Sequence, residues 1–517
     1  MTPKQQTVGA WLLGLVPALL VVSISYGHLA VAADSVTYIS AVESLRAGTG
    51  LGTWLESPLV VFPPGWPLLI AAGTLVGLGP ETSALVWIVV SLVAIPPLTL
   101  GIMRRVSSSW LAIWGAVAGL ALSPTIVSWG FGALSEVPFV MLVLAVALLG
   151  IRSIDGDDRF LWAAIGVGSI APLLRYAGVG VPLGLAVWVL LAGRQHRRVL
   201  RSGLAAVVGI IPLGLVIARN MAVADSAMGV REPSLLQPLE VVGQSLEGLG
   251  RSLLWGLDVA PQSLEMVVGI VFIGVALVAL ALAYRSDRAS EFSARLLLGG
   301  LGSAQLVVMV VSRMRVEIDD LGPRLLAPAT VMLLLLVFAA VGDMAVCWSD
   351  ASLGGLLQWR RIAAVATVVW CLVGVLATLR FALRDQVRGY DQDAYEAVRH
   401  SPVLDRLPED CAELTHVSKA VPKARGGCVL VANEPWLWFR SDLRPEISPR
   451  NFGSAKSSDL THIKEAHRNG ADVFLLWTTV SRPKSYLITP EGLSSQSNLE
   501  LVGESPGLRL YRLEPSG

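Results

Sequence analysis

Charged residues are scarce in this sequence. Asp, Glu, Lys and Arg make up 15% of its 517 residues, whereas 54% are hydrophobic and the mean hydropathy is +0.63. Soluble domains carry about 25% charged residues, so this composition excludes a chain built only of water-facing globules. The apolar residues form long uniform runs rather than alternating stripes, which is typical of segments that span a lipid bilayer.

The net charge is close to zero, and cysteines are few. The formal net charge of +1 gives no reason to expect a nucleic acid or another polyanion as a partner. Of the four cysteines, Cys347 and Cys371 fall in apolar runs, where they are expected to be small core residues. Cys411 and Cys428 fall in the polar C-terminal tail and could pair if that tail lies outside the cytosol; the sequence leaves this open. The first apolar run lacks a small-residue cleavage site, which is typical of a signal anchor.

About eleven transmembrane helices are predicted. A crossing of ~30 Å of hydrocarbon needs about 20 apolar residues. The stretch 160–193 is long enough for two crossings, with a break at Pro172, Arg175 and Pro182. The other nine runs lie near 8–27, 84–103, 110–129, 138–152, 200–218, 266–285, 295–312, 325–346 and 361–381.

Basic residues mark every second boundary between these runs. They are Lys4, Arg104, Arg105, Arg152, Arg159, Arg194, Arg197, Arg198, Arg201, Arg285, Arg288, Arg295, Arg360 and Arg361. All lie on one side if the short segment 66–79 rests at the interface instead of crossing. The positive-inside rule then predicts a multi-pass protein of the cytoplasmic (inner) membrane, with a cytosolic N-terminus and an extracytoplasmic C-terminus.

The predicted domains follow from this topology. Residues 1–384 form a membrane domain with two large outer loops, 28–83 and 219–265. Residues 385–517 form a small extracytoplasmic α/β domain. In it, 427–433, 471–477 and 508–514 have strand patterns, and 458–470 has the pattern of an amphipathic helix that ends at Gly470.

Several charged residues fall at the outer face, where the positive-inside rule expects few cations. Asp34 directly follows the first span, and Glu136 lies on a short outer turn. Each has a simple structural interpretation, as a helix cap or as a charge favoured by the helix dipole. Arg175, Arg219 and Arg324 lie at outer bends and ends of spans, where each alone could snorkel to the interface. Together, three arginines and two carboxylates at one depth indicate an anionic ligand, with a phosphate in the outer leaflet as the obvious candidate.

The order of short motifs resembles that of bacterial membrane glycosyltransferases of the GT-C superfamily. The likeness is closest to the group, similar to family 39, that includes protein O-mannosyltransferases and the lipid A aminoarabinose transferase. It covers about the first 340 residues. The motifs are Asp34 with Tyr38, PPGWPLL (63–69), SEVPF (135–139), LLRYAGV (173–179), ARN (218–220) and PRLLAP (323–328).

This resemblance implies a GT-C fold and an inverting hexosyl- or pentosyltransferase. The donor would be a polyprenyl-phosphate-linked sugar, and the acceptor a cell-envelope glycan, lipid or protein. Asp34 would be the base, and Glu136 would shape the acceptor or metal site. Arg175, Arg219 and Arg324 would bind the lipid phosphate, and Tyr38, Pro64, Trp66 and Tyr176 would line the substrate cavity.

The sequence departs from its relatives at two positions. Ser35 follows Asp34 where many relatives carry a second carboxylate, and Leu325 follows Arg324 where an aromatic residue is usual. The first departure weakens the case for a divalent metal, so no cofactor is firmly implied and the identity of any metal stays open.

Two rival functions use the same residues. A transporter or flippase for an anionic lipid or solute would need the arginines, but such proteins usually show inverted repeats and helices broken near mid-membrane, and this sequence shows neither. An assembly factor that binds a partner through its tail would tolerate the loss of Asp34.

Overall fold

The chain forms two compact units in the computed structural model. The helical unit comprises Met1–Gly27 and Val60–Arg384, and the sheet unit comprises His28–Leu59 and Asp385–Gly517. The first predicted outer loop, 28–83, is therefore divided: its residues 28–59 group with the tail, and its residues 60–83 with the helices. The structure describes residues 2–25, 29–30, 32–55, 57–192, 198–229, 231, 233–255, 260–285, 289–316, 318–347, 356–383, 400–408, 427–433, 446–447, 461–479, 488–494 and 497–514.

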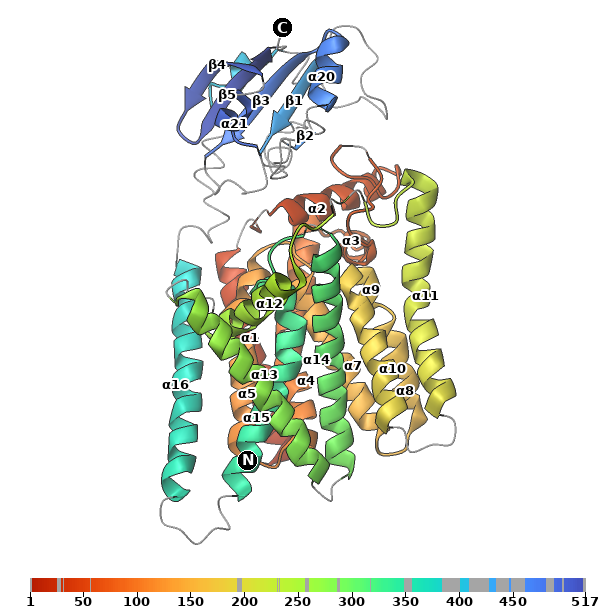
Figure 1. Cartoon of the computed structure of the whole chain (residues 1–517), viewed down its shortest axis with the longest axis vertical. Coiled ribbons are helices and arrows are strands. Elements are labelled where there is room, and N and C mark those ends of the chain that lie inside the picture. The colour runs from red at the N-terminus through yellow and green to blue at the C-terminus, as the bar shows by residue number, and fades with distance from the viewer. Residues whose placement is uncertain are drawn as a thin grey trace. The chain divides into compact units, whose positions relative to one another are not determined.

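The helical unit is a bundle of long apolar helices (Figure 1). The long helices are α1 (Pro3–Ile24), α4 (Pro80–Val106), α7 (Glu136–Ser153), α11 (Arg198–Ala224), α13 (Gln262–Arg285), α14 (Ala289–Arg315), α15 (Pro323–Cys347) and α16 (Leu356–Leu383). The shorter elements are α3 (Gly65–Thr74), α5 (Trp110–Ala121), α6 (Pro124–Ser128), η1 (Trp129–Phe131), α8 (Asp158–Gly168), α9 (Ala171–Leu174), η2 (Tyr176–Val179), α10 (Gly180–Ala192) and α12 (Pro238–Leu253).

Eight segments among the described residues are long and apolar enough to cross a membrane, and two shorter apolar helices cover Tyr176–Ala192 and Ala364–Arg380. The predicted multi-pass helical fold is confirmed, whereas the count of eleven stays a prediction. The stretch 160–193 is broken where expected, between α8 and α10. Helix α3 has ten residues, or about 15 Å at 1.5 Å per residue, which is too short to span ~30 Å of hydrocarbon. It is seen end-on in Figure 1, where α4 and α7 run lengthwise.

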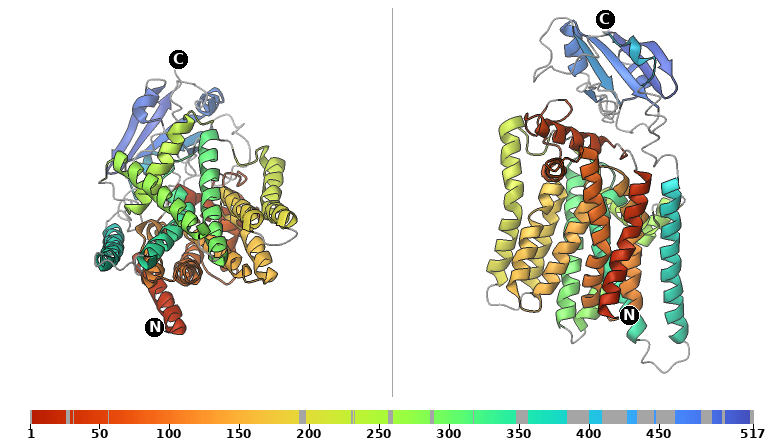
Figure 2. Two further views of the ribbon diagram at one scale, coloured as in Figure 1. Left: turned by 60° about the horizontal axis from the view of Figure 1, so that its bottom comes forward. Right: turned by 180° about the vertical axis from the view of Figure 1, so that it is seen from behind.

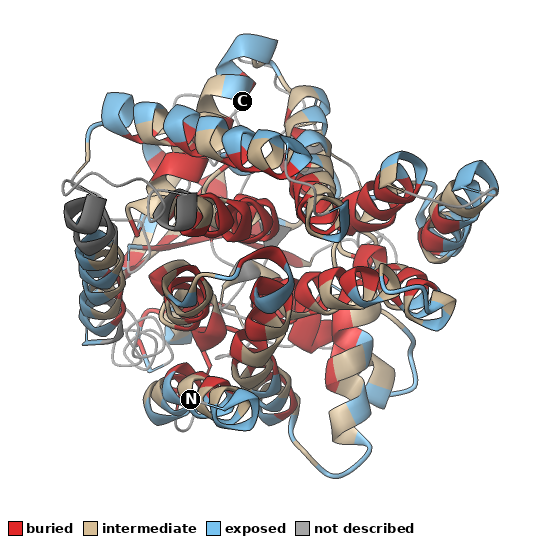
Figure 3. Cartoon of the chain, turned by 90° about the horizontal axis from the view of Figure 1, so that it is seen from below, coloured by how far each residue is buried: buried red, intermediate tan, exposed pale blue. Residues whose placement is uncertain are grey.

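Burial follows the position of each helix in the bundle. In the 18-residue apolar stretch of α15, 83% is buried, whereas the corresponding stretches of α1, α11 and α13 are 28%, 22% and 28% buried. Seen along the bundle, buried residues face inward and exposed residues face outward (Figure 3). Helix α1 packs on α4, α10 lies between α11 and α14, and α15 contacts α14, α13 and α5 (Figure 2). The exposed apolar surfaces of α1, α11 and α13 are those expected of helices that face lipid.

Polar contacts join the helices at the end of the bundle that carries the N-terminus. Arg104 donates to the carbonyl of Pro3 and to Gln6, at 3.0 and 2.7 Å. Arg105 pairs with Asp155 at 2.7 Å, and Arg201 pairs with Asp158 at 2.8 Å. We call this the N-terminal end, and the opposite end, where α7 and α15 begin, the site end.

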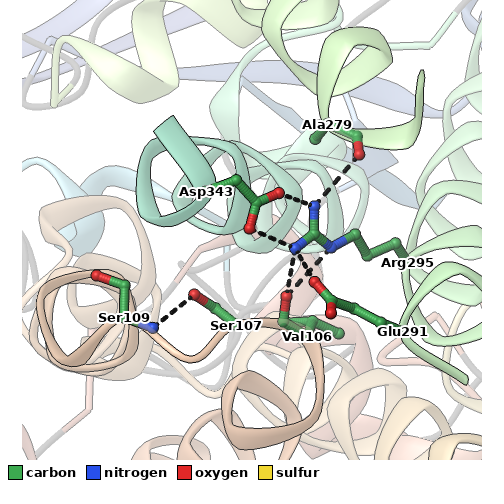
Figure 4. Close-up of polar contacts among 7 residues, drawn as sticks. All are labelled: Val106, Ser107, Ser109, Ala279, Glu291, Arg295 and Asp343. Carbon is green, nitrogen blue, oxygen red and sulfur yellow. Dashed lines mark hydrogen bonds and ion pairs between the residues drawn. The ribbon is translucent and has the colours of Figure 1, made fainter. Parts of the chain in front are cut away.

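One arginine at the N-terminal end is completely buried. Arg295, in the second turn of α14, is 0% exposed and pairs with both Glu291 and Asp343. Its guanidinium also donates to the carbonyl of Val106 at 2.7 and 3.1 Å and to that of Ala279 at 3.3 Å (Figure 4). Since Val106 ends α4 and Ala279 belongs to α13, this one side chain ties α4, α13, α14 and α15 together.

The sheet unit contains a five-stranded mixed sheet in the order β2-β1-β3-β5-β4. Strands β1 (Cys428–Ala432), β2 (Glu446–Ile447) and β3 (Asp472–Thr478) are parallel, and β4 (Asn498–Ser505) and β5 (Leu508–Glu514) are antiparallel additions. Helices α20 (Thr461–Arg468) and α21 (Pro490–Ser494) contribute Ile463, Ala466 and Leu493 to the core on one face. The three predicted strands and the predicted helix are confirmed. Gly470, with a φ of +76° just after α20, is the expected helix end.

The part of the first outer loop in this unit forms α2 (Ala33–Arg46). Val36 of α2 and Trp54 belong to the same buried apolar cluster as Leu430 and Phe474 of the sheet. Cys428 at the start of β1 is disulfide-bonded. Its predicted partner, Cys411, lies outside the described residues.

Candidate active site

A carboxylate held by two arginines lies at the site end of the helical unit. Glu136 Oε1 is 2.6 Å from Arg175 Nη1 and 2.5 Å from Arg324 Nε. The Glu136 side chain is 3% exposed, and those of the two arginines are 19% and 21% exposed. These three predicted site residues, 188 positions apart at the extremes, are therefore in direct contact.

Local sequence places each of the three groups. Glu136 is the first residue of α7, where a carboxylate is favoured by the helix dipole. Arg175 follows α9 in extended backbone, with φ of −150°, at the break before η2. Arg324 is the second residue of α15, just after Pro323, a residue whose fixed φ suits the first helical position. All three side chains thus belong to helix ends, where the backbone changes direction.

This triad joins two cations to one anion. The guanidinium groups of Arg175 and Arg324 both face the Glu136 carboxylate. Both arginines use the same carboxylate oxygen, whereas Glu136 Oε2 is buried and has no hydrogen-bond partner within the described parts of the chain. Arg175 also reaches Ser135 Oγ at 3.4 Å. Two guanidinium groups held close together are suited to bind an anion such as a phosphate.

Trp129 extends the triad. The Arg324 guanidinium carbon lies 5.8 Å from the centre of the Trp129 ring, a cation–π distance. The Trp129 Nε1 group is buried and finds no acceptor among the described residues. The sequence analysis did not single out this residue, because a tryptophan in an apolar run carries no signal of its own.

A second polar set begins one residue after Arg175. The Tyr176 hydroxyl donates to the carbonyl of Val60 at 2.7 Å and accepts from Asn220 Nδ2 at 3.0 Å. Asn220 is fully buried, and its Oδ1 accepts from Arg219 Nη1 at 3.0 Å. Arg219 is thus linked through Asn220 and Tyr176 to the chain beside Arg175.

Arg231 is a further cation of this set that the sequence analysis missed. Its Nη2 donates to the carbonyl of Val61 at 3.0 Å, next to the Val60 carbonyl bound by Tyr176. Gly229, with φ of +79°, packs so closely on Val61 that a Cβ atom would lie 2.8 Å from its side chain. The available signal was the one used for Arg219, an arginine beyond the outer end of a span.

The start of α3 lies beside these residues. Trp66 is 0% exposed and donates from Nε1 to the carbonyl of Ala133 at 3.1 Å, two residues before Ser135. A Cβ on Gly65 would lie 2.5 Å from the carbonyl oxygen of Leu173, two residues before Arg175. The PPGW motif therefore wedges between the segments that carry Glu136 and Arg175. Trp66 has the contacts of an anchoring residue, and the cavity-lining role of Pro64 and Trp66 stays a prediction.

Asp34 and Tyr38 belong to the sheet unit. Asp34 lies in the first turn of α2 and is half-buried, and Tyr38, one turn later on the same helix face, is buried. The two units are described separately, so the meeting of Asp34 with the arginines stays a prediction.

A divalent cation needs several oxygen, nitrogen or sulfur ligands at one site. Among the described residues, no group of three or more His, Cys, Asp or Glu side chains could hold a metal ion. At this site, Glu136 Oε1 already accepts from the guanidinium groups of Arg175 and Arg324. The described residues of this site therefore fit an anion and do not fit a metal.

Comparison with solved structures identifies the fold. The chain is similar to ArnT from Cupriavidus metallidurans in the apo state, with a TM-score of 0.55, 16% identity and coverage of 98% of each chain. The same protein bound to undecaprenyl phosphate matches with a TM-score of 0.55, 14% identity and 97% coverage of each chain. The Archaeoglobus fulgidus oligosaccharyltransferase, in complex with Zn and sulfate, matches with a TM-score of 0.53 and 13% identity, over 90% of this chain and 68% of that chain.

These neighbours define the class: the fold is that of GT-C superfamily glycosyltransferases, as the motif order predicted. More particularly, residues 61–312 match the model of Glycosyltransferase family 87. This range contains Glu136, Arg175 and Arg219. Comparison with curated protein sequences finds no match. The comparisons thus show a multi-pass membrane protein with the fold of the GT-C glycosyltransferases.

Proposed function

We propose that this protein transfers a hexosyl or pentosyl group from a polyprenyl-phosphate-linked donor to an acceptor at the outer face of the cytoplasmic membrane. The triad of Glu136, Arg175 and Arg324 carries this proposal, because it holds two guanidinium groups next to one another in a mostly buried site. The similar ArnT structure bound to undecaprenyl phosphate supports a lipid phosphate as its ligand. The acceptor is a cell-envelope glycan, lipid or protein.

The reaction we propose is a single displacement with inversion. Asp34 accepts the proton of the acceptor hydroxyl while that oxygen bonds to the anomeric carbon of the sugar. The bond between the anomeric carbon and the phosphate oxygen breaks, and its electron pair stays on the phosphate. The phosphodiester thus becomes a phosphate monoester and gains one negative charge. Arg175 and Arg324 stabilise that charge, as preorganised donors do where charge develops in a transition state.

Arg219 and Tyr176 have a supporting role in this proposal. Their link through Asn220 to the Val60 carbonyl holds the chain next to Arg175 in one conformation. Arg219 adds positive charge at the same end of the unit and remains a candidate for contact with the lipid phosphate. The donor reaches the site by lateral diffusion, since its polyprenyl chain keeps it in the membrane.

The orientation is part of the proposal. Arg104, Arg105, Arg201 and Arg295 gather at the N-terminal end of the bundle, which by the positive-inside rule supports a cytosolic N-terminus. The disulfide at Cys428 supports an extracytoplasmic tail, because disulfides persist in oxidising compartments.

Transfer can be tested with an Asp34→Asn variant. Envelope glycans are compared between cells that lack the protein, cells that carry the wild type and cells that carry the variant. We expect a glycan that disappears without the protein, returns with the wild type and stays absent with Asp34→Asn at equal membrane expression. A glycan restored by Asp34→Asn would contradict the role of base and favour the transporter or the assembly factor.

A further inference from the structure

The helical stretch 160–193 is interrupted beside the site, and its backbone needs hydrogen-bond partners there. Helix α9 ends at Leu174, Arg175 is extended, and η2 then leads into α10. The first four N–H groups of a helix have no partner within that helix. Val181, the second residue of α10, is 0% exposed, so its N–H group needs a partner within the protein. A buried backbone group that lacks one costs as much as a lost hydrogen bond.

A glutamine of α14 joins η2 to the start of α10. Gln305 is 2% exposed, and its side-chain amide lies between the two elements. The groups that face the amide fix its orientation. Its Oε1 accepts from the Val181 N–H at 3.1 Å, and its Nε2 donates to the carbonyl of Ala177 at 3.2 Å. Gln305 thus caps α10 from a neighbouring helix and ties it to the turn that follows Arg175.

Small residues let α14 come close enough for these bonds. A Cβ atom on Gly180 would lie 3.0 Å from Gln305 Cα, and one on Gly184 would lie 2.9 Å from the α14 backbone. Trp188, one turn further along α10, donates from Nε1 to the carbonyl of Ser293 at 2.9 Å. These positions of α10 recur every four residues and therefore form one seam against α14. Gln305 lies at the end of the seam that is nearer to Arg175.

We propose that Gln305 is a positioning residue, which holds Arg175 through η2 in the place where its guanidinium binds the donor phosphate. This inference rests on the proposed function, since it takes the ligand of Arg175 to be a lipid phosphate. The Ala177 carbonyl that Gln305 binds is only two residues from Arg175. The Arg175 carbonyl itself accepts from the Gly178 N–H at 2.7 Å, so a shift of η2 would also move Arg175.

The turn has no room to absorb such a shift by itself. A Cβ atom on Gly178 would lie 2.2 Å from the carbonyl oxygen of Ala171, so η2 packs directly on α9. Arg175 lies between these two elements, and its Nη1 is 2.6 Å from Glu136. The amide of Gln305 therefore fixes one side of a tightly packed turn whose other side carries the phosphate-binding arginine.

The test measures the binding of undecaprenyl phosphate to the full-length protein in detergent. Gln305→Leu fills similar volume but removes both hydrogen bonds. The matched control is Trp188→Phe, which removes a bond between the same two helices farther from Arg175. Both variants should lower the melting temperature. Only Gln305→Leu should raise the dissociation constant of undecaprenyl phosphate, by about three- to ten-fold, the range that one lost hydrogen bond represents.

A double variant separates positioning from folding. If Gln305 acts through Arg175, then Gln305→Leu/Arg175→Ala should bind undecaprenyl phosphate no more weakly than Arg175→Ala alone. Two residues that act independently would instead weaken binding by the product of their separate factors. A multiplicative loss in the double variant therefore contradicts the positioning role.

The outcomes distinguish this inference from the proposed function. An unchanged dissociation constant in Gln305→Leu, or an equal rise in Trp188→Phe, overturns the role of Gln305 while the donor class stands. If Gln305→Leu does not fold, Gly180→Ala takes its place, because the added Cβ atom would press on Gln305 Cα and shift the amide. An unchanged dissociation constant in that variant overturns the role in the same way. If the wild type binds undecaprenyl phosphate no more tightly than undecaprenol, the proposed donor class itself is wrong.

Discussion

Replacement of Arg295 by methionine should destabilise the helical unit more than any other loss of a single cation at its N-terminal end. The side chain is 0% exposed and contacts Glu291, Asp343 and the carbonyls of Val106 and Ala279. Methionine fills similar volume but donates no hydrogen bond to any of these four groups. Removal of one partner of a buried ion pair costs about 3–5 kcal/mol. Glu291 and Asp343 are 16% and 24% exposed, so water can partly solvate them, which places the loss near ~3 kcal/mol.

This loss can be measured as a fall in the melting temperature of the purified protein in detergent. A protein of this size loses about 2 °C per kcal/mol, so Arg295→Met should melt about 6 °C below the wild type. The matched control is Arg105→Met, which breaks a pair with Asp155 whose side chains are 50% and 51% exposed. Such exposed pairs contribute about 1 kcal/mol at most, so this control should melt within about 2 °C of the wild type. Equal melting temperatures for the two variants would refute the reasoning, because burial would then have made no difference.

Two other predictions concern the site and the topology. Arg175→Ala and Arg324→Ala should each raise the apparent KM for the donor by about ten-fold or more, the value of one lost charge-assisted hydrogen bond. Their effects on expression should be smaller. If the only effect of these variants is a failure to insert in the membrane, the phosphate role is unsupported. Single cysteines introduced at Arg105 and at Asn469, both exposed positions, should react with a membrane-impermeant thiol reagent from opposite sides of the membrane. Labelling of both positions from the same side would contradict the proposed orientation.

Hydropathy alone predicted most of the helical unit. The apolar runs correspond to α1, α4, α7, α11, α13, α14, α15 and α16, because a membrane-spanning helix satisfies its own backbone hydrogen bonds and needs only length and apolarity. Two strands of the tail were also predicted from local pattern, because the buried strands β1 and β3 are short continuous apolar runs bounded by polar residues. Strand β4 was missed, because its alternation is weak and four of its eight residues are exposed.

Contacts between distant segments were beyond what a local pattern can show. From the sequence, Arg295 is expected to be an exposed cation at the end of a span. In the structure its buried side chain instead bonds to groups of four helices. Glu136 and Arg324 were predicted to share a membrane side, but only the folded chain reveals that Glu136 binds two arginines through one oxygen. Residues 28–59 adjoin the first span in sequence and nevertheless group with the sheet unit.

The sequence by itself determined that this is a multi-pass protein with a polar α/β tail, and its motif order indicated the GT-C fold. These properties follow from short stretches of chain, whose hydropathy and periodicity do not depend on their neighbours in space. The tertiary structure decided which charges meet, how many face one another and which of them are buried. The free energy of an ion pair depends on separation and local dielectric, and neither quantity exists until the helices have packed.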